Sequence, residues 1–270
     1  MRPIRIGIQL HPQHGPYENL RSAVSVTDEI GADVLYTWDH FYPLYGDLEG
    51  SHFECWTMLA AWAEQTENVE LGALVTCNTY RNPQLLADMA RTVDHVSGGR
   101  LILGLGSGWF GRDYEEYGYE FGTGASRLRA LGEALPLIKE RWSKLNPAPT
   151  RDIPILIGGT GEKVTLRLIA RHGQAWHASF PSHPEALAPK VEALRHWCEV
   201  EGRDPEDIEW GLGVQPAGLD TVLNDHADAY LEMGFTQFTL GYDGPDWDVA
   251  TSRDWLSWRD ERNASRAKVT

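Results

Sequence analysis

The stretch from Val69 to Trp109, VELGALVTCNTYRNPQLLADMARTVDHVSGGRLILGLGSGW, decides the fold of this 270-residue chain. Its first part is apolar with no charge after Glu70, which is typical of a strand covered on both faces. Asn-Pro at 82–83 then begins a helix, because proline fits the first helical position. Serine and two glycines at 97–99 end that helix before a second apolar strand. Three- and four-residue spacing predicts one buried helical stripe, made of Leu85, Leu86, Met89, Val93 and Val96.

Both strands of this β-α-β unit run into loops of small and polar residues. The loops are Thr76-Cys77-Asn78 and Gly106-Ser107-Gly108. If the strands are parallel neighbours, their carboxyl ends lie at one edge, and both loops open onto the same face. Ligands bind at that face in α/β folds, so we expect the functional site there.

The same alternation continues along the whole chain. Eight apolar strand segments alternate with eight helical segments, the last beginning at about Trp247. Alternation predicts a parallel sheet, and eight repeats over about 250 residues are the size of a (β/α)8 barrel. A doubly wound open sheet is the alternative, but it usually has fewer strands. We therefore predict an α/β fold, a TIM barrel in a single domain over residues 1–270, with an irregular segment at residues 112–124.

The composition excludes several classes of protein. The formal net charge of −15 argues against nucleic acid as a partner, because phosphate binding requires a basic surface. No apolar run approaches the ~20 residues of a membrane helix, and the first ten residues lack the apolar core of a signal peptide. Cys55, Cys77 and Cys198 are odd in number and far apart, which is typical of reduced thiols. We therefore expect a cytoplasmic protein.

Asp39 and His40 are the candidate catalytic pair. They follow the second strand, at the end from which barrel enzymes draw their catalytic groups. Histidine carries protons near neutral pH, so His40 is suited to acid or base catalysis. The alternative is a hydrogen-bonded pair that only shapes the loop.

Two glycine-rich loops are candidates for ligand binding. Residues 106–111 match the G-x-G-x-x-G pattern, but no helix is expected there and no acidic residue follows at the ribose-binding distance. Such glycines let the backbone approach a ligand, because a Cβ would collide; a plain strand-end turn is the alternative. Residues 158–161 precede a helix expected at 162–171, whose free N–H groups attract anions. Lys163 and Arg167 would add positive charge there, and Glu162 would subtract some.

A metal site is the weaker interpretation of the histidines. His11 and His14 are candidate ligands with His40 or His177, as in a barrel hydrolase. The His-x-His or carboxylate spacing of such sites is missing. We therefore predict no metal, and Arg81 is left as a residue that either faces the site or caps its loop.

The chain resembles the bacterial luciferase-like flavin and deazaflavin oxidoreductases, and within them the actinobacterial branch that uses coenzyme F420. The resemblance is carried by Trp38-Asp39-His40-Phe41, by residues 71–109 and by residues 155–176. Within the second segment, TYRNP, DHVSGGR and GLGSGW occur in the family's order. The resemblance implies a (β/α)8 barrel, which agrees with the count of strands and helices, and a homodimer.

The resemblance also implies which residues hold the cofactor. Asp39 and His40 would lie beside a deazaflavin ring, with His40 as a base or substrate binder. Leu74 and Val75 fall where many members have a non-prolyl cis peptide that backs the ring. The other cofactor-binding residues implied are Thr76 and Asn78 near the ring edge, and Gly106, Ser107, Gly108, Gly158, Gly159, Thr160 and Gly161 around its side chain and phosphate.

The function implied is hydride transfer between F420 and a small organic substrate, because in such enzymes the cofactor carries the chemistry. Trp109 stands where the family's sugar-phosphate dehydrogenases have a catalytic glutamate, and no basic cluster follows the last two strands. Glucose 6-phosphate is therefore not expected as the substrate. The alternatives are an FMN-dependent monooxygenase of the same family, a metal-dependent barrel hydrolase, and a barrel that binds a ligand without catalysis.

Overall fold

Strands and helices alternate along residues 2–181 and 183–268, which this computed structural model describes. Residues 1, 182, 269 and 270 of the predicted domain lie outside the described part, and its range stays a prediction. The strands are β1 (Arg5–Leu10), β2 (Val34–Thr37), β3 (Glu70–Ala73), β4 (Thr76–Cys77), β5 (Leu101–Gly106), β6 (Ile155–Gly158), β7 (Ala175–Ala178), β8 (Glu209–Val214) and β9 (Gln237–Tyr242). The α-helices are α1 (Tyr17–Glu29), α2 (Cys55–Gln65), α3 (Pro83–Val96), α4 (Gly111–Tyr117), α5 (Gly124–Trp142), α6 (Thr165–His172), α7 (Ala188–Glu201), α8 (Leu219–Thr221), α9 (Ala227–Met233) and α10 (Arg253–Ala267). Short 3-10 turns lie at Pro184–Leu187, Pro205–Asp207, Pro216–Gly218 and Val249–Ser252, and a π turn at Val222–His226.

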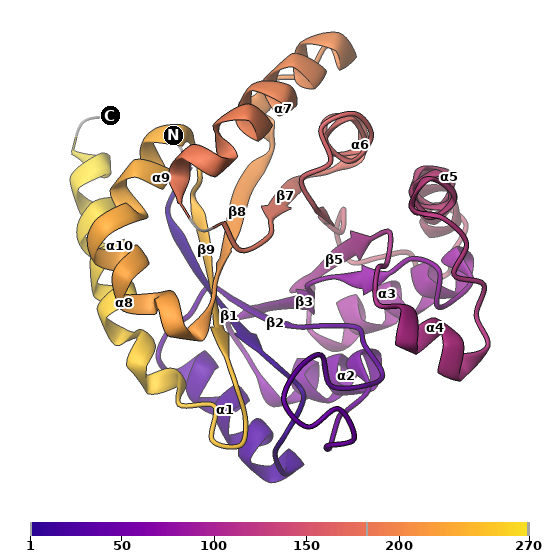
Figure 1. Cartoon of the computed structure of the whole chain (residues 1–270), viewed down its shortest axis with the longest axis horizontal. Helices are drawn as coiled ribbons and strands as arrows, with labels where there is room; N and C mark the ends of the chain where they lie inside the picture. Colours follow the sequence, from indigo (N-terminus) through magenta and orange to yellow (C-terminus); the bar gives the residue numbers. More distant parts are fainter. Residues whose placement is uncertain (1, 182, 269–270) are drawn as a thin grey trace.

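All the strands pair in parallel and close into a barrel surrounded by helices (Figure 1). The order is β3-β2-β1-β9-β8-β7-β6-β5-β4, and β3 also pairs with β5. Because β3 pairs with the start of β5 and β4 with its end, the two short strands form one interrupted wall strand. The barrel therefore has eight strands, as predicted, and the open sheet is excluded.

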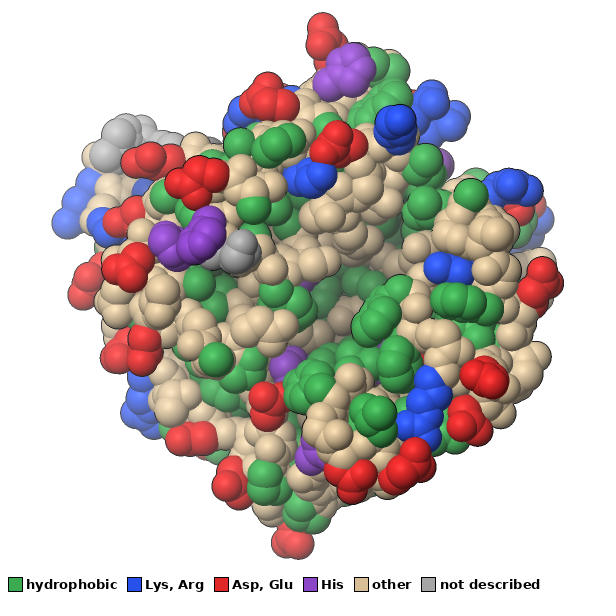
Figure 2. All heavy atoms as spheres, in the orientation of Figure 1, with side chains coloured by type: hydrophobic (Ala, Val, Ile, Leu, Met, Phe, Trp, Pro, Cys, Tyr) green, Lys and Arg blue, Asp and Glu red, His purple; other side chains and the backbone are tan. Residues whose placement is uncertain are grey.

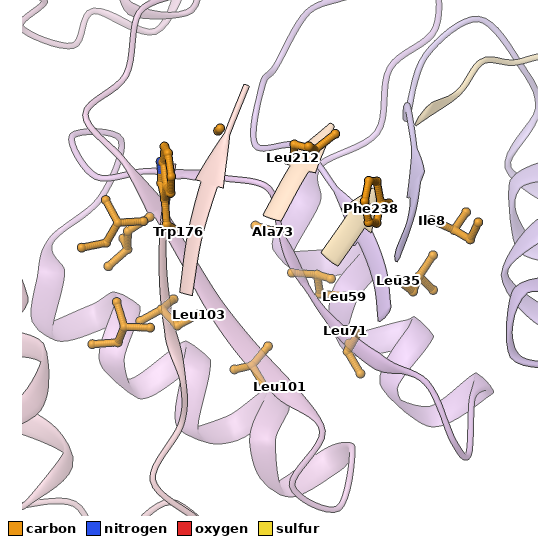
Figure 3. Close-up of a cluster of buried hydrophobic side chains, with 14 of the residues drawn as sticks. Ile8, Leu35, Leu59, Leu71, Ala73, Leu101, Leu103, Trp176, Leu212 and Phe238 are labelled. Atoms are coloured by element: carbon orange, nitrogen blue, oxygen red, sulfur yellow. The ribbon is translucent and has the colours of Figure 1, made fainter. Parts of the chain in front are cut away.

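The core follows the two-residue alternation of the strands. Val34 and Tyr36 of β2 point into the barrel, whereas Leu35 between them packs outward against the helices. Figure 3 shows part of this outer layer, in which strand residues such as Leu71 lie beside Leu59 of α2. The barrel is thus covered on both faces of its wall.

The buried stripe predicted for α3 is wrong at its two ends. Leu85 is 53% exposed and Val96 is 36% exposed. The residues that α3 does bury are Leu86, Ala87, Ala90, Val93 and Asp94. Small alanines bring the helix close to its neighbours, and Asp94 is accommodated because it accepts hydrogen bonds from the backbone and hydroxyl of Thr150.

Three predicted boundaries also differ from the structure. The segment predicted to be irregular contains α4, which buries Asp113 and Tyr114 and ends at Gly118 in the left-handed region, where φ is +68°. A helix therefore does follow the 106–111 glycine pattern. Helix α6 begins at Thr165 rather than at residue 162, and α10 begins at Arg253 after a 3-10 turn. A short helix of seven residues has too few apolar positions to show a period in the sequence.

Gly104 of β5 lies at the closest approach within the barrel wall. A Cβ on this residue would overlap the carbonyl oxygen of Ala73, a backbone atom that has no other position in the sheet. We expect Gly104→Ala to lower the free energy of unfolding by about 1–3 kcal/mol. Gly132→Ala in α5 is the control, because its Cβ would come no closer than 3.4 Å to Leu168. Urea unfolding of both variants checks this prediction, and equal stability of the two would contradict it.

Candidate active site

A cavity of about 520 Å³ opens at the carboxyl ends of the barrel strands. Figure 2 shows a hollow near the middle of the molecule, bordered mainly by hydrophobic and uncharged atoms. Nine residues predicted as site residues line the cavity: Asp39, His40, Leu74, Val75, Gly106, Ser107, Gly108, Gly158 and Gly159. Segments from far apart in the sequence thus meet as expected for this end of the barrel.

The floor of the cavity is the break between β3 and β4. The peptide bond between Leu74 and Val75 is cis, as the family resemblance implied. Gln9 of β1 donates a hydrogen bond from Nε2 to the Leu74 carbonyl oxygen at 3.0 Å, which ties the break to a strand two positions away in the barrel. Sequence reasoning missed Gln9, because a polar residue within an apolar strand gave no sign of its partner.

The glycines around the cavity make room for protein atoms. A Cβ on Gly106 would lie 2.5 Å from Val75 Cγ2, and one on Gly158 would lie 3.0 Å from Val75 Cγ1. At Gly108 a Cβ would overlap the hydroxyl of Tyr114. Packing within the chain thus already disfavours a Cβ at these three positions, and the approach of their backbone to a ligand stays a prediction.

The carboxylate of Asp39 is buried, and both of its oxygens accept hydrogen bonds. Its two oxygens accept hydrogen bonds from Arg81 at 2.6 and 2.9 Å, and one of them also accepts the backbone N–H of Cys77 at 2.9 Å. Burial disfavours the charge of Arg81, but the hydrogen bonds and charge of Asp39 outweigh it and raise the pKa of Arg81. Arg81 thus contacts the site by way of Asp39. A carboxylate bound in this way is better suited to holding neighbouring groups in position than to transferring a proton.

His40 is held in one orientation by Asp113 of α4. Its Nδ1 lies 2.8 Å from Asp113 Oδ2, and Asp113 also accepts hydrogen bonds from the hydroxyl of Tyr80 at 2.7 Å and from the N–H of Phe41 at 3.2 Å. Burial and the Asp113 carboxylate raise the pKa of Tyr80, which keeps it a donor. Nδ1 therefore carries the proton of a neutral His40, and Nε2 remains for a ligand.

Asp113 was not identified from the sequence. The sequence offered only four acidic residues in the aromatic segment 112–124 after a strand end, and nothing in it singled out Asp113 among them.

The other histidines do not form a metal site with His40. Burial lowers the pKa of His177 to about 3, so this residue is neutral in the cavity wall. His11 Nδ1 lies 2.6 Å from Asp243 Oδ1 and 2.7 Å from the hydroxyl of Tyr45. In the described part of the chain, no group of three or more His, Cys, Asp or Glu residues is placed to hold a metal ion.

Four predicted cofactor residues lie outside the cavity lining: Thr76, Asn78, Thr160 and Gly161. Thr76 Oγ1 and Asn78 Oδ1 are buried without hydrogen-bond partners, as are Gln9 Oε1 and His177 Nε2 in the lining itself. Unpartnered buried polar atoms are costly. Their position at the strand ends fits a flat heterocyclic ligand that carries its own donors and acceptors.

The loop after β6 offers less charge than predicted. Arg167 binds Glu201 at 3.0 Å and lies over the ring of Trp197. Glu162 is paired with Lys190. Lys163 is exposed, and no described residue bonds to it, so it is the cation of this loop that is free for an anionic group.

A family model described as luciferase-like monooxygenase matches residues 1–266. The chain belongs to this family. The luciferase-like chain is 30% identical to a putative coenzyme F420-dependent oxidoreductase of Mycobacterium tuberculosis, over 87% of its own length and 79% of that protein. It is 28% identical to an F420-dependent glucose-6-phosphate dehydrogenase of Amycolatopsis mediterranei, over 75% of its own length, and the match spans 66% of that dehydrogenase.

Solved structures share the barrel of the luciferase-like chain. An F420-dependent secondary alcohol dehydrogenase in complex with an F420-acetone adduct has a TM-score of 0.78 at 17% identity, covering 92% of this chain and 96% of that chain. A riboflavin lyase with modified FMN and substrate riboflavin has a TM-score of 0.75 at 12% identity, covering 98% of this chain and 92% of that chain. At such low identities these likenesses support the fold alone.

Proposed function

We propose that this chain is an F420-dependent oxidoreductase that transfers a hydride between the deazaflavin and a small organic substrate. The observation that carries the proposal is the cavity at the carboxyl ends of the strands, which brings His40 together with Leu74–Val75 and with the glycine loops after β5 and β6. Relatives at 28% and 30% identity that are named as F420-dependent support the choice of cofactor.

The cofactor would lie across the strand ends, and it supplies the hydride chemistry when bound. Leu74 and Val75 would support one face of its ring, with Thr76 and Asn78 near the edge. Ser107 and the glycines of the loops after β5 and β6 would hold its side chain, and the free cation of Lys163 is suited to its phosphate.

His40 would move the proton that accompanies the hydride. Asp113 fixes its Nδ1, so a substrate oxygen in the cavity meets Nε2. A neutral imidazole accepts a proton there, and a protonated one donates it. Asp39, bound by Arg81, would hold the strand end that presents His40.

The rest of the assignment follows from the family resemblance and the composition. The protein would be a cytoplasmic homodimer that binds neither nucleic acid nor a membrane. Among the described residues, no helix is long and apolar enough to cross a membrane. FMN is the alternative cofactor, in which case the chain would be a monooxygenase.

Titration of the purified chain with F420 and with FMN, each followed by fluorescence, tests the cofactor. We expect F420 to bind with a micromolar dissociation constant and FMN to bind at least about tenfold more weakly, which is a difference of about 1.4 kcal/mol. Binding of FMN alone would move the assignment to a monooxygenase. Binding of neither would refute the proposal.

A further inference from the structure

The cavity wall outside the predicted cofactor positions carries no free charge. In the described part of the chain, the lining contains no lysine or arginine. Its remaining polar groups are neutral side chains such as Gln215, Ser179 and the uncharged imidazole of His177. An ionised substrate would therefore lose its hydration without gaining an ion pair.

Three arginines near this wall already have partners. Arg127 donates hydrogen bonds to the carbonyl oxygens of Gly108 and Phe121. Arg81 binds Asp39 with both of its terminal nitrogens. Arg112, in the helix that follows Trp109, binds Glu49 and lies over the ring of Tyr42. The net charge of −15 also repels anions from the protein as a whole.

Three aromatic rings stand in the lining at the cavity mouth. Trp109 is 63% exposed, Tyr45 is 42% exposed and Phe180 is 40% exposed. They follow β5, β2 and β7, so they approach the mouth from three sides. Trp109 lies edge-to-face with His40, with 5.7 Å between ring centroids. A ring face that is exposed beside the proposed proton carrier offers a stacking surface to a flat substrate.

We propose that the substrate is an uncharged aromatic ketone or its alcohol, stacked on Trp109 with its oxygen at His40. This inference rests on the proposed function. In the reducing direction the carbonyl carbon gains a hydride with its two electrons from the reduced cofactor, which is thereby oxidised, and the oxygen gains a proton from His40. In the oxidising direction neutral His40 takes the hydroxyl proton, and the hydride passes from carbon to the oxidised cofactor.

Three matched ketones test the two properties separately. Acetophenone is flat and neutral, cyclohexyl methyl ketone has a saturated ring of the same carbon count, and 4-acetylbenzoate adds one negative charge. Dissociation constants are measured by ligand-observed NMR, on the chain with and without F420. We expect acetophenone to bind about 2- to 10-fold more tightly than the saturated ketone. We expect 4-acetylbenzoate to bind about 100-fold more weakly than acetophenone.

Variants assign the preference to Trp109. Trp109→Ala is expected to abolish the preference for acetophenone over cyclohexyl methyl ketone, and Trp109→Phe to retain it. Phe180→Ala is a second test at the mouth, with a smaller loss of the same preference. Leu85→Ala changes a side chain that is 53% exposed on α3, outside the cavity lining, and should leave all three constants unchanged.

The outcomes separate this inference from the proposed function. Equal or tighter binding of 4-acetylbenzoate, or an unchanged aromatic preference in Trp109→Ala, would overturn the substrate class even if F420 binds. Failure of F420 to bind would refute the proposed function. The ketone affinities measured without F420 would still show whether the cavity wall prefers uncharged aromatic ligands. Turnover of acetophenone with reduced F420, or of 1-phenylethanol with oxidised F420, supports both.

Discussion

His40→Gln is expected to lower kcat by about 10²–10⁴-fold, the usual contribution of a positioned acid or base. Glutamine keeps a polar side chain in the cavity but cannot exchange a proton near neutral pH. Because the change removes proton transfer and leaves the loops after β5 and β6 intact, the loss of kcat should far exceed any loss of F420 affinity. Steady-state kinetics and fluorescence titration of the same protein preparation measure the two effects.

The pH dependence of kcat separates a proton carrier from a structural side chain. The wild-type profile should contain a limb due to His40, and His40→Gln should lack it. Asp113→Asn should keep more activity than His40→Gln, because the carboxylate on Nδ1 is lost while Nε2 remains in the cavity. His196→Gln, on the exposed face of α7, is the matched control. Activity of His40→Gln within tenfold of the wild type, with the limb retained, would show that another group carries the proton.

The fold could be predicted because its signals are local. Each strand or helix is marked by its own period and by nearby glycines and prolines, and eight such pairs predict a closed barrel. The prediction of the buried stripe on α3 was wrong at its ends because alanine, or an aspartate that accepts hydrogen bonds, can be buried against a close neighbour as well as leucine can. Leu85 and Val96 fit the helical period, yet both side chains are exposed.

The site could be predicted only in part, because its partners are distant in the sequence. His40 was predicted from its place after the second strand, and the cis peptide at Leu74–Val75 from the family resemblance. The structure bears out the peptide. Asp113 is 73 positions from His40, and Arg81 is 42 positions from Asp39. The hydrophobic period of a single helix or strand contains no information about such long-range pairs. The functional assignments of the individual residues stay predictions until the variants are measured.

Removal of Arg81 is expected to cause the largest loss of stability of any single change at the site. The side chain of Asp39 is fully buried and that of Arg81 is 11% exposed. Arg81→Met therefore leaves a buried carboxylate whose one remaining partner among the described residues is the N–H of Cys77. Such uncompensated charges cost about 3–5 kcal/mol. Urea unfolding at neutral pH, with the wild type in parallel, gives the difference in free energy of unfolding.

Two further variants show whether burial is the cause. Lys144→Met breaks the pair with Glu140 on α5, in which both side chains are more than half exposed, and should cost at most about 1 kcal/mol. The double variant Asp39→Asn with Arg81→Met removes the unpaired buried charge and should recover part of the lost stability.

If Arg81→Met costs no more than Lys144→Met, the Asp39–Arg81 pair does not stabilise the end of β2. If the cost is large and F420 binding weakens with it, the pair holds the strand end against which the cofactor is proposed to lie. The role of Asp39 would then be to position His40, which is the next residue in the chain.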